Sequence, residues 1–252
     1  MGTTQAKNIM HELKLGGMLE QYDTLIHSAT TSGLGCGEFL DLILQSEYDF
    51  RKKRKIESRI KSSKLPRKKT FEDFDYSAER TITKAQIKEL VSLRWLEQGR
   101  PVLLIGQTGV GKSFIAESCA MQACRAGKIS LWTDISALLE ELALSKTSGT
   151  YVKLRDKLSR PDVLVIDDFG MRKLNSTEAQ DLCEILETRS YGKSTIITTQ
   201  LPLTHWVEVI GDPVIADAII DRLKHSAVEL KIKGPTYREY IARKLDSGGI
   251  KN

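Results

Sequence analysis

The chain has 252 residues, of which 40% are hydrophobic, and its formal net charge is +5. This length suits one large domain or a medium domain with a small appendage, and the hydrophobic content is enough for a buried core. No apolar run approaches the roughly 18 residues that a membrane-spanning helix needs, and the N-terminus lacks the apolar stretch of a secretory signal. We therefore expect no membrane partner and a cytosolic protein, in which reduced thiols are favoured over disulfides.

The net charge conceals one strongly basic segment, residues 51–69. It holds eleven lysines and arginines and a single acid, Glu57, so it carries +10, while the other 233 residues together carry −5. Such a concentration indicates a localised polyanion contact, and the scarcity of aromatics disfavours stacking on single strands. The alternative is a solvated helix face and linker. The candidate contacts to the phosphates of duplex DNA are Arg51, Lys52, Lys53, Arg54, Lys55, Arg59, Lys61, Lys64, Arg67, Lys68 and Lys69.

Residues 1–68 are predicted to form a small helical domain. Two apolar stripes at helical spacing flank a turn at residues 31–35, and the second stripe runs into the basic segment. Pro66 ends this second helix, because proline disfavours helical geometry in the residue before it. We therefore place a domain boundary here, which leaves residues 69–252 as a second domain.

From Thr70 onward, short runs of Val, Ile and Leu alternate with helical patterns. This alternation predicts the α/β class, with a mostly parallel sheet covered by helices on both faces. Such sheets bind ligands at the carboxyl ends of their strands. The expected strands are 102–105, 129–133, 163–167, 195–199 and 227–232, and the expected helices are 84–97, 113–126, 135–144, 176–190 and 213–223.

A nucleotide-phosphate loop is predicted between the first of these strands and the helix after it. The pattern G-x-x-x-x-G-K-[ST] is matched without a gap, in the strand-to-helix context that it requires. Backbone N–H groups and the helix dipole would hold the phosphates, Lys112 would neutralise their charge, and Ser113 would bind Mg²⁺. The loop consists of Gly106, Gln107, Thr108, Gly109, Val110, Gly111, Lys112 and Ser113.

Two carboxylates follow the apolar run 163–166 directly. A strand of this kind delivers Asp167 and Asp168 to the edge of the sheet beside the phosphate loop. We expect Asp167 to hold Mg²⁺, directly or through water, and Asp168 to orient or deprotonate the attacking water. Without the loop upstream, this pair would be interpreted as a capped, solvated strand end.

Polar residues also end the next expected strand. Gln200 is the first candidate to contact the γ-phosphate or the attacking water, and Thr199 is the second; the alternative is that both open the loop before Pro202. Farther along the chain, Arg222 could reach the γ-phosphate of a neighbouring subunit, where an arginine stabilises transition-state charge. By composition alone, Arg222 would be a surface residue paired with an acid.

This ordered set resembles that of an AAA+ ATPase of the IstB/DnaC branch. Residues 233–238 (Lys-Gly-Pro-Thr-Tyr-Arg) are similar to the Gly-x-Ser-Tyr-Arg signature of that branch, and residues 64–66 and 71–75 resemble the lead-in of IstB-type proteins. The resemblance spans nearly the whole chain. It implies an AAA+ P-loop domain that uses ATP and Mg²⁺, and a homo-oligomer with shared ATP sites. It also implies binding to DNA and to a partner transposase in insertion-sequence transposition, in the bacterial cytoplasm and nucleoid.

Carried over by position, the resemblance makes residues 106–113 the Walker A loop and Asp167-Asp168 the Walker B pair. Gln200 falls at the sensor-1 position, where the branch more often has Asn, and Arg222 at the arginine-finger position. AAA+ proteins usually carry Glu at the second Walker B position, so the shorter Asp168 implies slow hydrolysis suited to a timed switch. Arg238 lies in the terminal signature without an assigned role.

Three functions follow from these observations. The leading hypothesis is a DNA-dependent ATPase that assembles on duplex DNA and controls a transposase. A DnaC-like replicative helicase loader shares the ATPase core but uses its N-terminal domain chiefly to grip a protein ring. A nucleotide-binding regulatory module that hydrolyses nothing would account for Asp168. Preference for duplex or single-stranded DNA separates the first two, and a phosphate-release assay decides the third.

Overall fold

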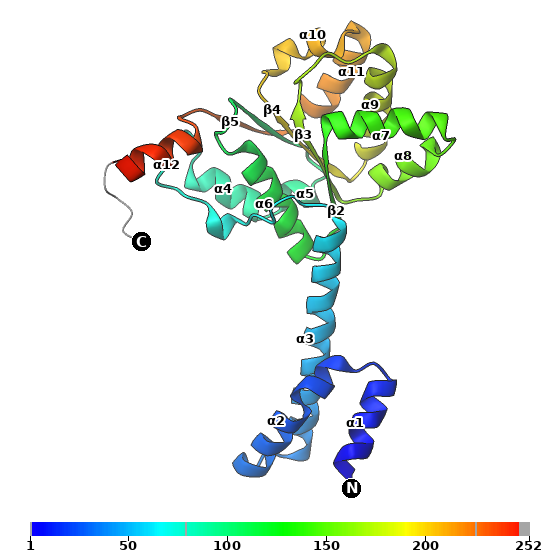
Figure 1. Cartoon of the computed structure of the whole chain (residues 1–252), viewed down its shortest axis with the longest axis vertical. Coiled ribbons are helices and arrows are strands. Elements are labelled where there is room, and N and C mark those ends of the chain that lie inside the picture. Colours follow the sequence, from blue (N-terminus) through cyan, green and yellow to red (C-terminus); the bar gives the residue numbers. More distant parts are fainter. Residues whose placement is uncertain (1, 79, 225, 247–252) are drawn as a thin grey trace. The chain divides into compact units, whose positions relative to one another are not determined.

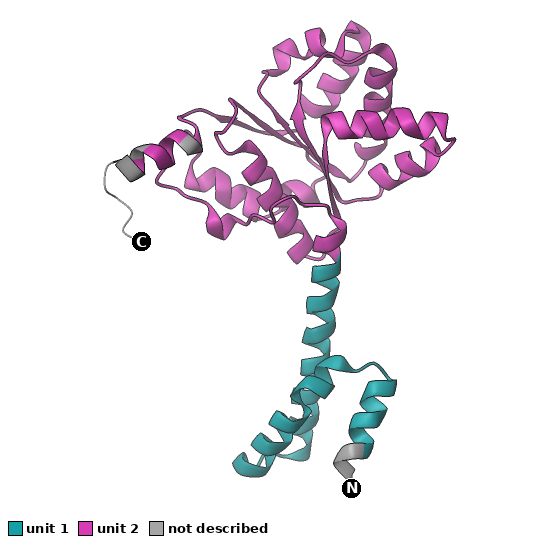
Figure 2. Cartoon of the chain, viewed as in Figure 1, with its two compact units in different colours: residues 1–58 teal, residues 59–252 magenta. Residues whose placement is uncertain are grey.

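The computed structural model describes residues 2–78, 80–224 and 226–246 (Figure 1). The chain divides into two compact units, Met1–Ser58 and Arg59–Asn252 (Figure 2). Within the described ranges, no helix combines the length and the apolar character that crossing a membrane requires.

The first unit is helical, as predicted. It contains α1 (Gly2–Glu12), α2 (Gly16–Ser32) and most of α3 (Cys36–Ser62). Gly33 ends α2 in the left-handed region, with φ +66°, which a residue without a Cβ adopts readily. This glycine forms the turn that was expected between the two helical stretches.

A buried glutamate of α3 holds the N-terminus of α2. Glu47 is 6% exposed, and its Oε2 accepts hydrogen bonds from the N–H groups of Gly17 at 2.7 Å and Met18 at 3.2 Å. Its Oε1 accepts a hydrogen bond from Arg51 Nε at 2.6 Å. Gly17 packs so closely that a Cβ there would lie 2.4 Å from the carbonyl oxygen of Ser46. One carboxylate therefore satisfies free donors of α2 and fixes the packing of these two helices.

The second unit begins earlier than the boundary expected after residue 68. The Ser63 carbonyl accepts a hydrogen bond from the N–H of Trp132 at 2.8 Å, and Leu65 is only 7% exposed within a core of the second unit. Residues 59–68 therefore belong to the second unit, because both their backbone and an apolar side chain pack on it. The charge run and Pro66 gave no signal of this packing.

The second unit is built on a five-stranded parallel sheet with the order β2-β3-β4-β1-β5. This arrangement confirms the expected strands, with small shifts at their ends. Because β4 lies between β1 and β3, the phosphate loop and the acidic strand end lie on either side of the end of β4. The strands are β1 (Val102–Gly106), β2 (Ser130–Asp134), β3 (Val163–Phe169), β4 (Ser194–Thr199) and β5 (Val228–Ile232).

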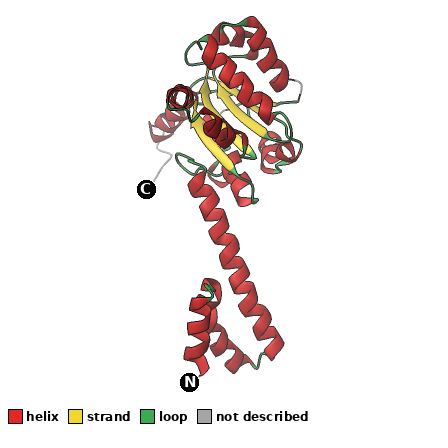
Figure 3. Ribbon diagram, turned by 90° about the vertical axis from the view of Figure 1, so that its right-hand side faces the viewer, coloured by secondary structure: helices red, strands yellow, loops and turns green. Residues whose placement is uncertain are grey.

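Helices cover both faces of this sheet, as expected (Figure 3). Leu103 and Ile105 of β1 pack with α7 to α11, whereas Val102 and Leu104 pack with α4, α5 and α6. The division follows because successive strand side chains point to opposite faces. The helices are α4 (Lys84–Val91), α5 (Arg94–Glu97), α6 (Lys112–Arg125), α7 (Ile135–Thr147), α8 (Tyr151–Ser159), α9 (Ser176–Arg189), α10 (Trp206–Ile210), α11 (Pro213–Lys224) and α12 (Tyr237–Asp246), with short 3-10 turns η1 (Phe71–Asp73) and η2 (Leu203–His205).

We expect Glu47→Ala to destabilise the first unit by about 2–3 kcal/mol, because it removes the partner of Arg51 and of two helix N–H groups. Burial alone would raise the pKa of Glu47, but hydrogen bonds from Arg51, Met18 and Gly17 hold it below its ordinary value of 4.5. The stabilisation is therefore fully present above pH 4.5 and is lost as the pH falls through the lowered folded pKa. Amide hydrogen exchange of the first unit in the full chain measures this loss.

The exposed Glu12, at the end of α1, provides the matched control. Glu12→Ala should leave the exchange protection of α2 and α3 unchanged. If Glu47→Ala retains the protection of the parent protein at neutral pH, the carboxylate does not stabilise this unit.

Candidate nucleotide-binding site

The phosphate loop connects the end of β1 to the start of α6. Gly106 ends the strand, and α6 begins at Lys112 directly after Gly111, whose φ is +103°. A Cβ at Gly106 would lie 2.2 Å from the carbonyl oxygen of Ile232 in β5, so glycine is required for the approach of that strand. The first turn of α6 leaves N–H groups without intrahelical partners, which makes this end of the helix suited to an anion.

Lys112 supplies the cation of the loop. Its side chain is 5% exposed, and its Nζ donates to the carbonyl oxygen of Gln107 at 2.9 Å. Burial lowers the pKa of Lys112, while the nearby carboxylates of Asp168 and Asp167 act in the opposite direction by favouring the charged form. The ammonium group is thus held within the loop near both aspartates, where it can neutralise phosphate charge.

Asp167 joins three elements through its hydrogen bonds. Ser113 Oγ in α6 donates to Asp167 Oδ1 at 3.0 Å, and Thr198 Oγ1 in β4 donates to the same oxygen at 2.5 Å. Burial raises the pKa of Asp167, the two hydroxyls lower it, and the neighbouring Asp168 and Asp134 raise it further. Hydroxyl and carboxylate oxygens are ligands that Mg²⁺ prefers, so Ser113 and Asp167 are the side chains that could hold it.

Asp168 has an unusual backbone conformation beside this group. Its φ is +58°, in the left-handed region that residues with a Cβ rarely enter. The pairing of β3 with β4 shifts between Ile166 and Phe169, and the N–H of Asp168 donates to Thr198 Oγ1 at 2.9 Å. Both aspartates therefore contact Thr198, which sequence reasoning missed. One signal was available in the sequence. Thr198 lies within the apolar strand that comes next along the chain after the strand ending in the two aspartates.

The two candidates at the end of β4 differ in their surroundings. Gln200 follows β4 directly, and its Nε2 donates to Met171 Sδ at 3.2 Å in the segment after β3. Thr199 is fully buried, and its hydroxyl accepts a hydrogen bond from the N–H of Leu201 at 3.1 Å. Gln200 thus lies at the edge that carries the aspartates, whereas the hydroxyl of Thr199 is turned into the local backbone.

Arg222 lies at the opposite edge of the sheet, where the parallel strands begin. It lines a cavity of about 40 Å³ with Pro101, which precedes β1, and Thr195, near the start of β4. The phosphate loop follows the other end of β1, whose 5 residues span about 17 Å. The guanidinium donates to the Ala218 carbonyl at 2.7 Å and forms an ion pair with Glu187 at 3.2 Å. The fold therefore separates Arg222 from the phosphate loop of its own chain.

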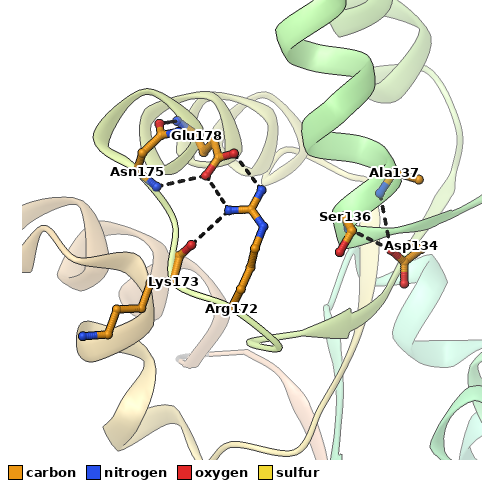
Figure 4. Close-up of polar contacts among 7 residues, drawn as sticks. All are labelled: Asp134, Ser136, Ala137, Arg172, Lys173, Asn175 and Glu178. Atoms are coloured by element: carbon orange, nitrogen blue, oxygen red, sulfur yellow. Dashed lines mark hydrogen bonds and ion pairs between the residues drawn. The ribbon is translucent and has the colours of Figure 1, made fainter.

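Asp134 and Arg172 secure two helix starts at the carboxyl edge (Figure 4). Asp134 ends β2 opposite Asp167, and its carboxylate accepts the N–H of Ser136 at 2.8 Å in the first turn of α7. Arg172, in the segment after β3, donates two hydrogen bonds to Glu178 of α9, at 2.9 and 2.7 Å. These contacts fix the segments that follow β2 and β3, next to the aspartates.

A second cation, Arg80, contacts the phosphate loop. Its guanidinium donates to the carbonyl oxygens of Val110 at 3.4 Å and Asp75 at 2.5 Å, and lies 4.5 Å from the centre of the Phe74 ring. A Cβ at Gly111 would lie 2.7 Å from this guanidinium. No motif marks Arg80, so the sequence gave no signal for it.

The terminal signature also reaches the loop, because the N–H of Tyr237 at the start of α12 donates to the Gly109 carbonyl at 2.8 Å. This contact places the start of α12 against the loop. The side chain of Arg238 lies outside the described part of the chain.

The basic residues of α3 differ in their neighbours. Lys53 and Arg54 line a groove of about 350 Å³ together with the carboxylates of Glu20, Asp49 and Glu57. Their positive charge is therefore partly offset at close range.

Two other lysines of α3 do not line this groove. Arg51 is paired with Glu47. Lys52 and Lys55 are exposed, have no ion-pair partner among the described residues, and fall by helical periodicity on the side away from Lys53. Among the basic-segment residues of the first unit, Lys52 and Lys55 are thus the cations most available to an external polyanion.

The rest of the basic segment belongs to the second unit. The N–H of Arg67 donates at 2.5 Å to Oε1 of Glu117, a residue of α6 that is 2% exposed. The backbone is anchored here while the charged groups stay at or near the surface. The basic residues of the segment that belong to the second unit are Arg59, Lys61, Lys64, Arg67, Lys68 and Lys69.

We expect Asp167→Asn to raise the melting temperature of the ligand-free protein by roughly 2–4 °C, measured with a chelator present. Between the ordinary pKa of 3.8 and the raised folded pKa of Asp167, the folded state binds more protons than the unfolded chain. Stability therefore falls as the pH rises through this window, and the loss persists at neutral pH. Asparagine can accept the same two hydroxyl hydrogen bonds without the charge.

Asp162→Asn should have the opposite effect. Burial would raise the pKa of Asp162, but hydrogen bonds from the N–H of Ile129 and from Lys193 outweigh it and hold the pKa below its ordinary value. Loss of this charge should lower the melting temperature. A lower melting temperature in both variants would show that burial of the Asp167 charge does not destabilise the protein.

Comparison with known proteins shows the family to which the chain belongs. Residues 8–244 match the model of the family described as IstB-like ATP binding protein. The insertion-sequence ATP-binding protein y4pL of Sinorhizobium fredii is 36% identical over 93% of this chain and 96% of its own length. The insertion sequence IS21 ATP-binding protein of Pseudomonas aeruginosa is 33% identical over 94% of this chain and 89% of its own length.

Solved structures agree on the fold. The crystal structure of DnaI has a TM-score of 0.57 at 20% identity, over 66% of this chain and 91% of that one. AMPPCP-bound DnaA from Aquifex aeolicus has a TM-score of 0.57 at 17% identity, over 75% of this chain and 58% of that one. The fold is therefore that of AAA+ proteins, and the chain belongs to the IstB-like ATP-binding family of insertion sequences.

Proposed function

We propose that this protein is an AAA+ ATPase that oligomerises on duplex DNA and controls a transposase in insertion-sequence transposition. The observation that carries the proposal is the division of the nucleotide machinery between two edges of one sheet. Lys112, Ser113, Asp167 and Asp168 gather at one edge, and Arg222 lies at the other. The insertion-sequence names of the relatives support the role in transposition. The proposed location, the bacterial cytoplasm at the nucleoid, follows from that role.

The site fits a nucleoside triphosphate with Mg²⁺. The first turn of α6, which begins at Lys112, leaves N–H groups that can bind phosphate oxygens, and the Ser113 hydroxyl lies 3.0 Å from the Asp167 carboxylate. Bound Mg²⁺ would supply charge that neutralises phosphate oxygens. We infer that Ser113 and Asp167 hold the metal ion, while Lys112 holds the β- and γ-phosphates.

Hydrolysis is assigned to Asp168, with Gln200 at the same edge of the sheet. Asp168 would orient or deprotonate water, and Gln200 would contact that water or the γ-phosphate. The carboxylate of Asp168 is one methylene shorter than the glutamate usual in AAA+ proteins, which favours slow turnover. Thr199 is the weaker candidate, because its hydroxyl already accepts the N–H of Leu201.

An oligomer would bring Arg222 to the site of the next subunit. Because Arg222 and the phosphate loop occupy opposite edges of the sheet, a head-to-tail contact is the arrangement that unites them. ATP at the contact would then order the interface, and hydrolysis would release it.

We expect Lys112→Ala and Arg222→Ala each to abolish ATPase activity, and a mixture of the two to recover part of it. One subunit supplies the intact loop and its neighbour the intact arginine, so random mixing completes about a quarter of the sites. The measurement is phosphate release on duplex DNA by each variant alone and by the equimolar mixture.

The double variant, carrying both substitutions in one chain, is the control. Mixing it with either single variant should give no recovery. A mixture of the single variants that stays inactive, although both fold and bind DNA, would contradict the shared site.

Contact with duplex DNA is assigned to the basic segment, with Lys52 and Lys55 as its main contacts within the first unit. Both are exposed and have no ion-pair partner among the described residues, whereas Lys53 and Arg54 lie beside three carboxylates. Phosphate contacts of this kind set position along the duplex without reading its sequence.

We expect the double substitution Lys52→Ala and Lys55→Ala to flatten the salt dependence of duplex binding. Each lost phosphate contact reduces the slope of log K against log salt by about 0.9. Lys53→Ala with Arg54→Ala should change the slope less, because nearby carboxylates already offset these charges. Binding to a labelled duplex across a salt series measures the slopes.

Exposed lysines outside the basic segment, Lys153 and Lys173, serve as the control pair. Their replacement by alanine should leave the slope unchanged. An unchanged slope after loss of Lys52 and Lys55 would move the DNA contact elsewhere.

A DnaC-like helicase loader is the second candidate. The crystal structure of the DnaC helicase loader has a TM-score of 0.52 at 23% identity, over 59% of this chain, which shows a shared fold alone. Preference for single-stranded DNA, or capture of a replicative helicase instead of a transposase in a pull-down, would favour this candidate.

A further inference from the structure

The hydroxyl of Thr198 connects both aspartates at the end of β3. It donates to Asp167 Oδ1 at 2.5 Å and accepts a hydrogen bond from the N–H of Asp168 at 2.9 Å. Thr198 is fully buried, so water does not compete for either bond. Ser113 reaches only Asp167, and among the described residues Thr198 is the side chain that is hydrogen-bonded to both.

The second of these bonds stabilises a bulge in the sheet. Ile166 of β3 lies opposite Ile197, and the pairing resumes with Phe169 opposite Thr199. Two residues of β3, Asp167 and Asp168, therefore oppose the single residue Thr198, which is the pattern of a β-bulge. The N–H of Asp168 is outside the regular ladder, and the Thr198 hydroxyl is its acceptor.

This bulge determines where the two carboxylates go. In an unbroken strand, successive side chains point to opposite faces, which would separate Asp167 from Asp168. Asp168 instead adopts φ +58°, a conformation that costs free energy for a residue with a Cβ and persists only where its surroundings hold it. The contact with Thr198 is the side-chain interaction that holds it here.

We propose that Thr198 is a positioning residue for the metal-dependent reaction, acting through both aspartates. The assignment rests on the proposed ATPase function. Two hydroxyls occupy Oδ1 of Asp167, which leaves its other carboxylate oxygen for a metal ion. By holding the bulge, Thr198 also sets the direction of the Asp168 carboxylate.

The test compares Thr198→Val, which keeps the shape and removes the hydroxyl, with Thr198→Ser, which keeps the hydroxyl. Ser145→Ala is the matched control, because Ser145 is a buried hydroxyl (5% exposed) that donates to the Leu142 carbonyl in α7. Three quantities are measured: kcat, the Mg²⁺ concentration for half-maximal activity, and the affinity for a fluorescent ATP analogue with Mg²⁺ and with EDTA.

Thr198→Val should lower kcat about tenfold and raise the half-maximal Mg²⁺ concentration by a similar factor, as is usual when the partner of a metal-binding carboxylate is removed. Its affinity for the analogue in EDTA should stay within about twofold of the parent, because the loop that holds the phosphates is untouched. Thr198→Ser should keep both kcat and the half-maximal Mg²⁺ concentration near the values of the parent protein. Ser145→Ala should match the parent in both.

Unchanged kcat and Mg²⁺ dependence in Thr198→Val would overturn the assignment. So would an equal loss of affinity in EDTA, which would reveal general damage to the loop, and so would a failure of serine to restore the Mg²⁺ dependence. If the parent protein hydrolyses no ATP, the proposed function fails in its hydrolytic part. The gain in analogue affinity on adding Mg²⁺ then still decides the role of Thr198.

Discussion

The hydrogen bonds on the Asp167 carboxylate tie together the elements from which the nucleotide site is built. They connect α6 through Ser113, β4 through Thr198, and β3, which carries the aspartate itself. This group exists because β4 lies next to β3 in a parallel sheet, so that strand ends meet at one edge. The burial that makes these bonds strong also disfavours the charge of Asp167. The site therefore holds a carboxylate in surroundings that favour an added cation.

Much of the fold could be predicted because its signals are local. Apolar runs such as Val163–Ile166 are short, bounded and spaced by helical patterns, which specifies a parallel sheet. The phosphate loop is equally local, since eight consecutive residues define it. Gly106 shows the physical reason, because a Cβ there would collide with the Ile232 carbonyl. The backbone path thus constrains the sequence strongly at this position.

The remainder depends on contacts between residues far apart in the chain. The role of Thr198 requires the register of β3 against β4 and a bulge that no local pattern announces. Arg80 contacts the phosphate loop only in the folded chain. The packing of Leu65 on the second unit likewise moved a boundary that composition placed later. In the basic segment, the sequence showed the charge but not its partners, and Arg51 is bound to the buried Glu47.

The position of Arg222 at the edge of the sheet opposite the phosphate loop has a consequence for stoichiometry. If the arginine completes the site of the next subunit, a single chain has no complete site. An open row of subunits then has one fewer complete site than it has members, whereas a closed ring has as many sites as members. Turnover per subunit would rise with the length of a row but stay constant among rings. The dependence of specific activity on protein concentration thus carries information about the geometry of the assembly.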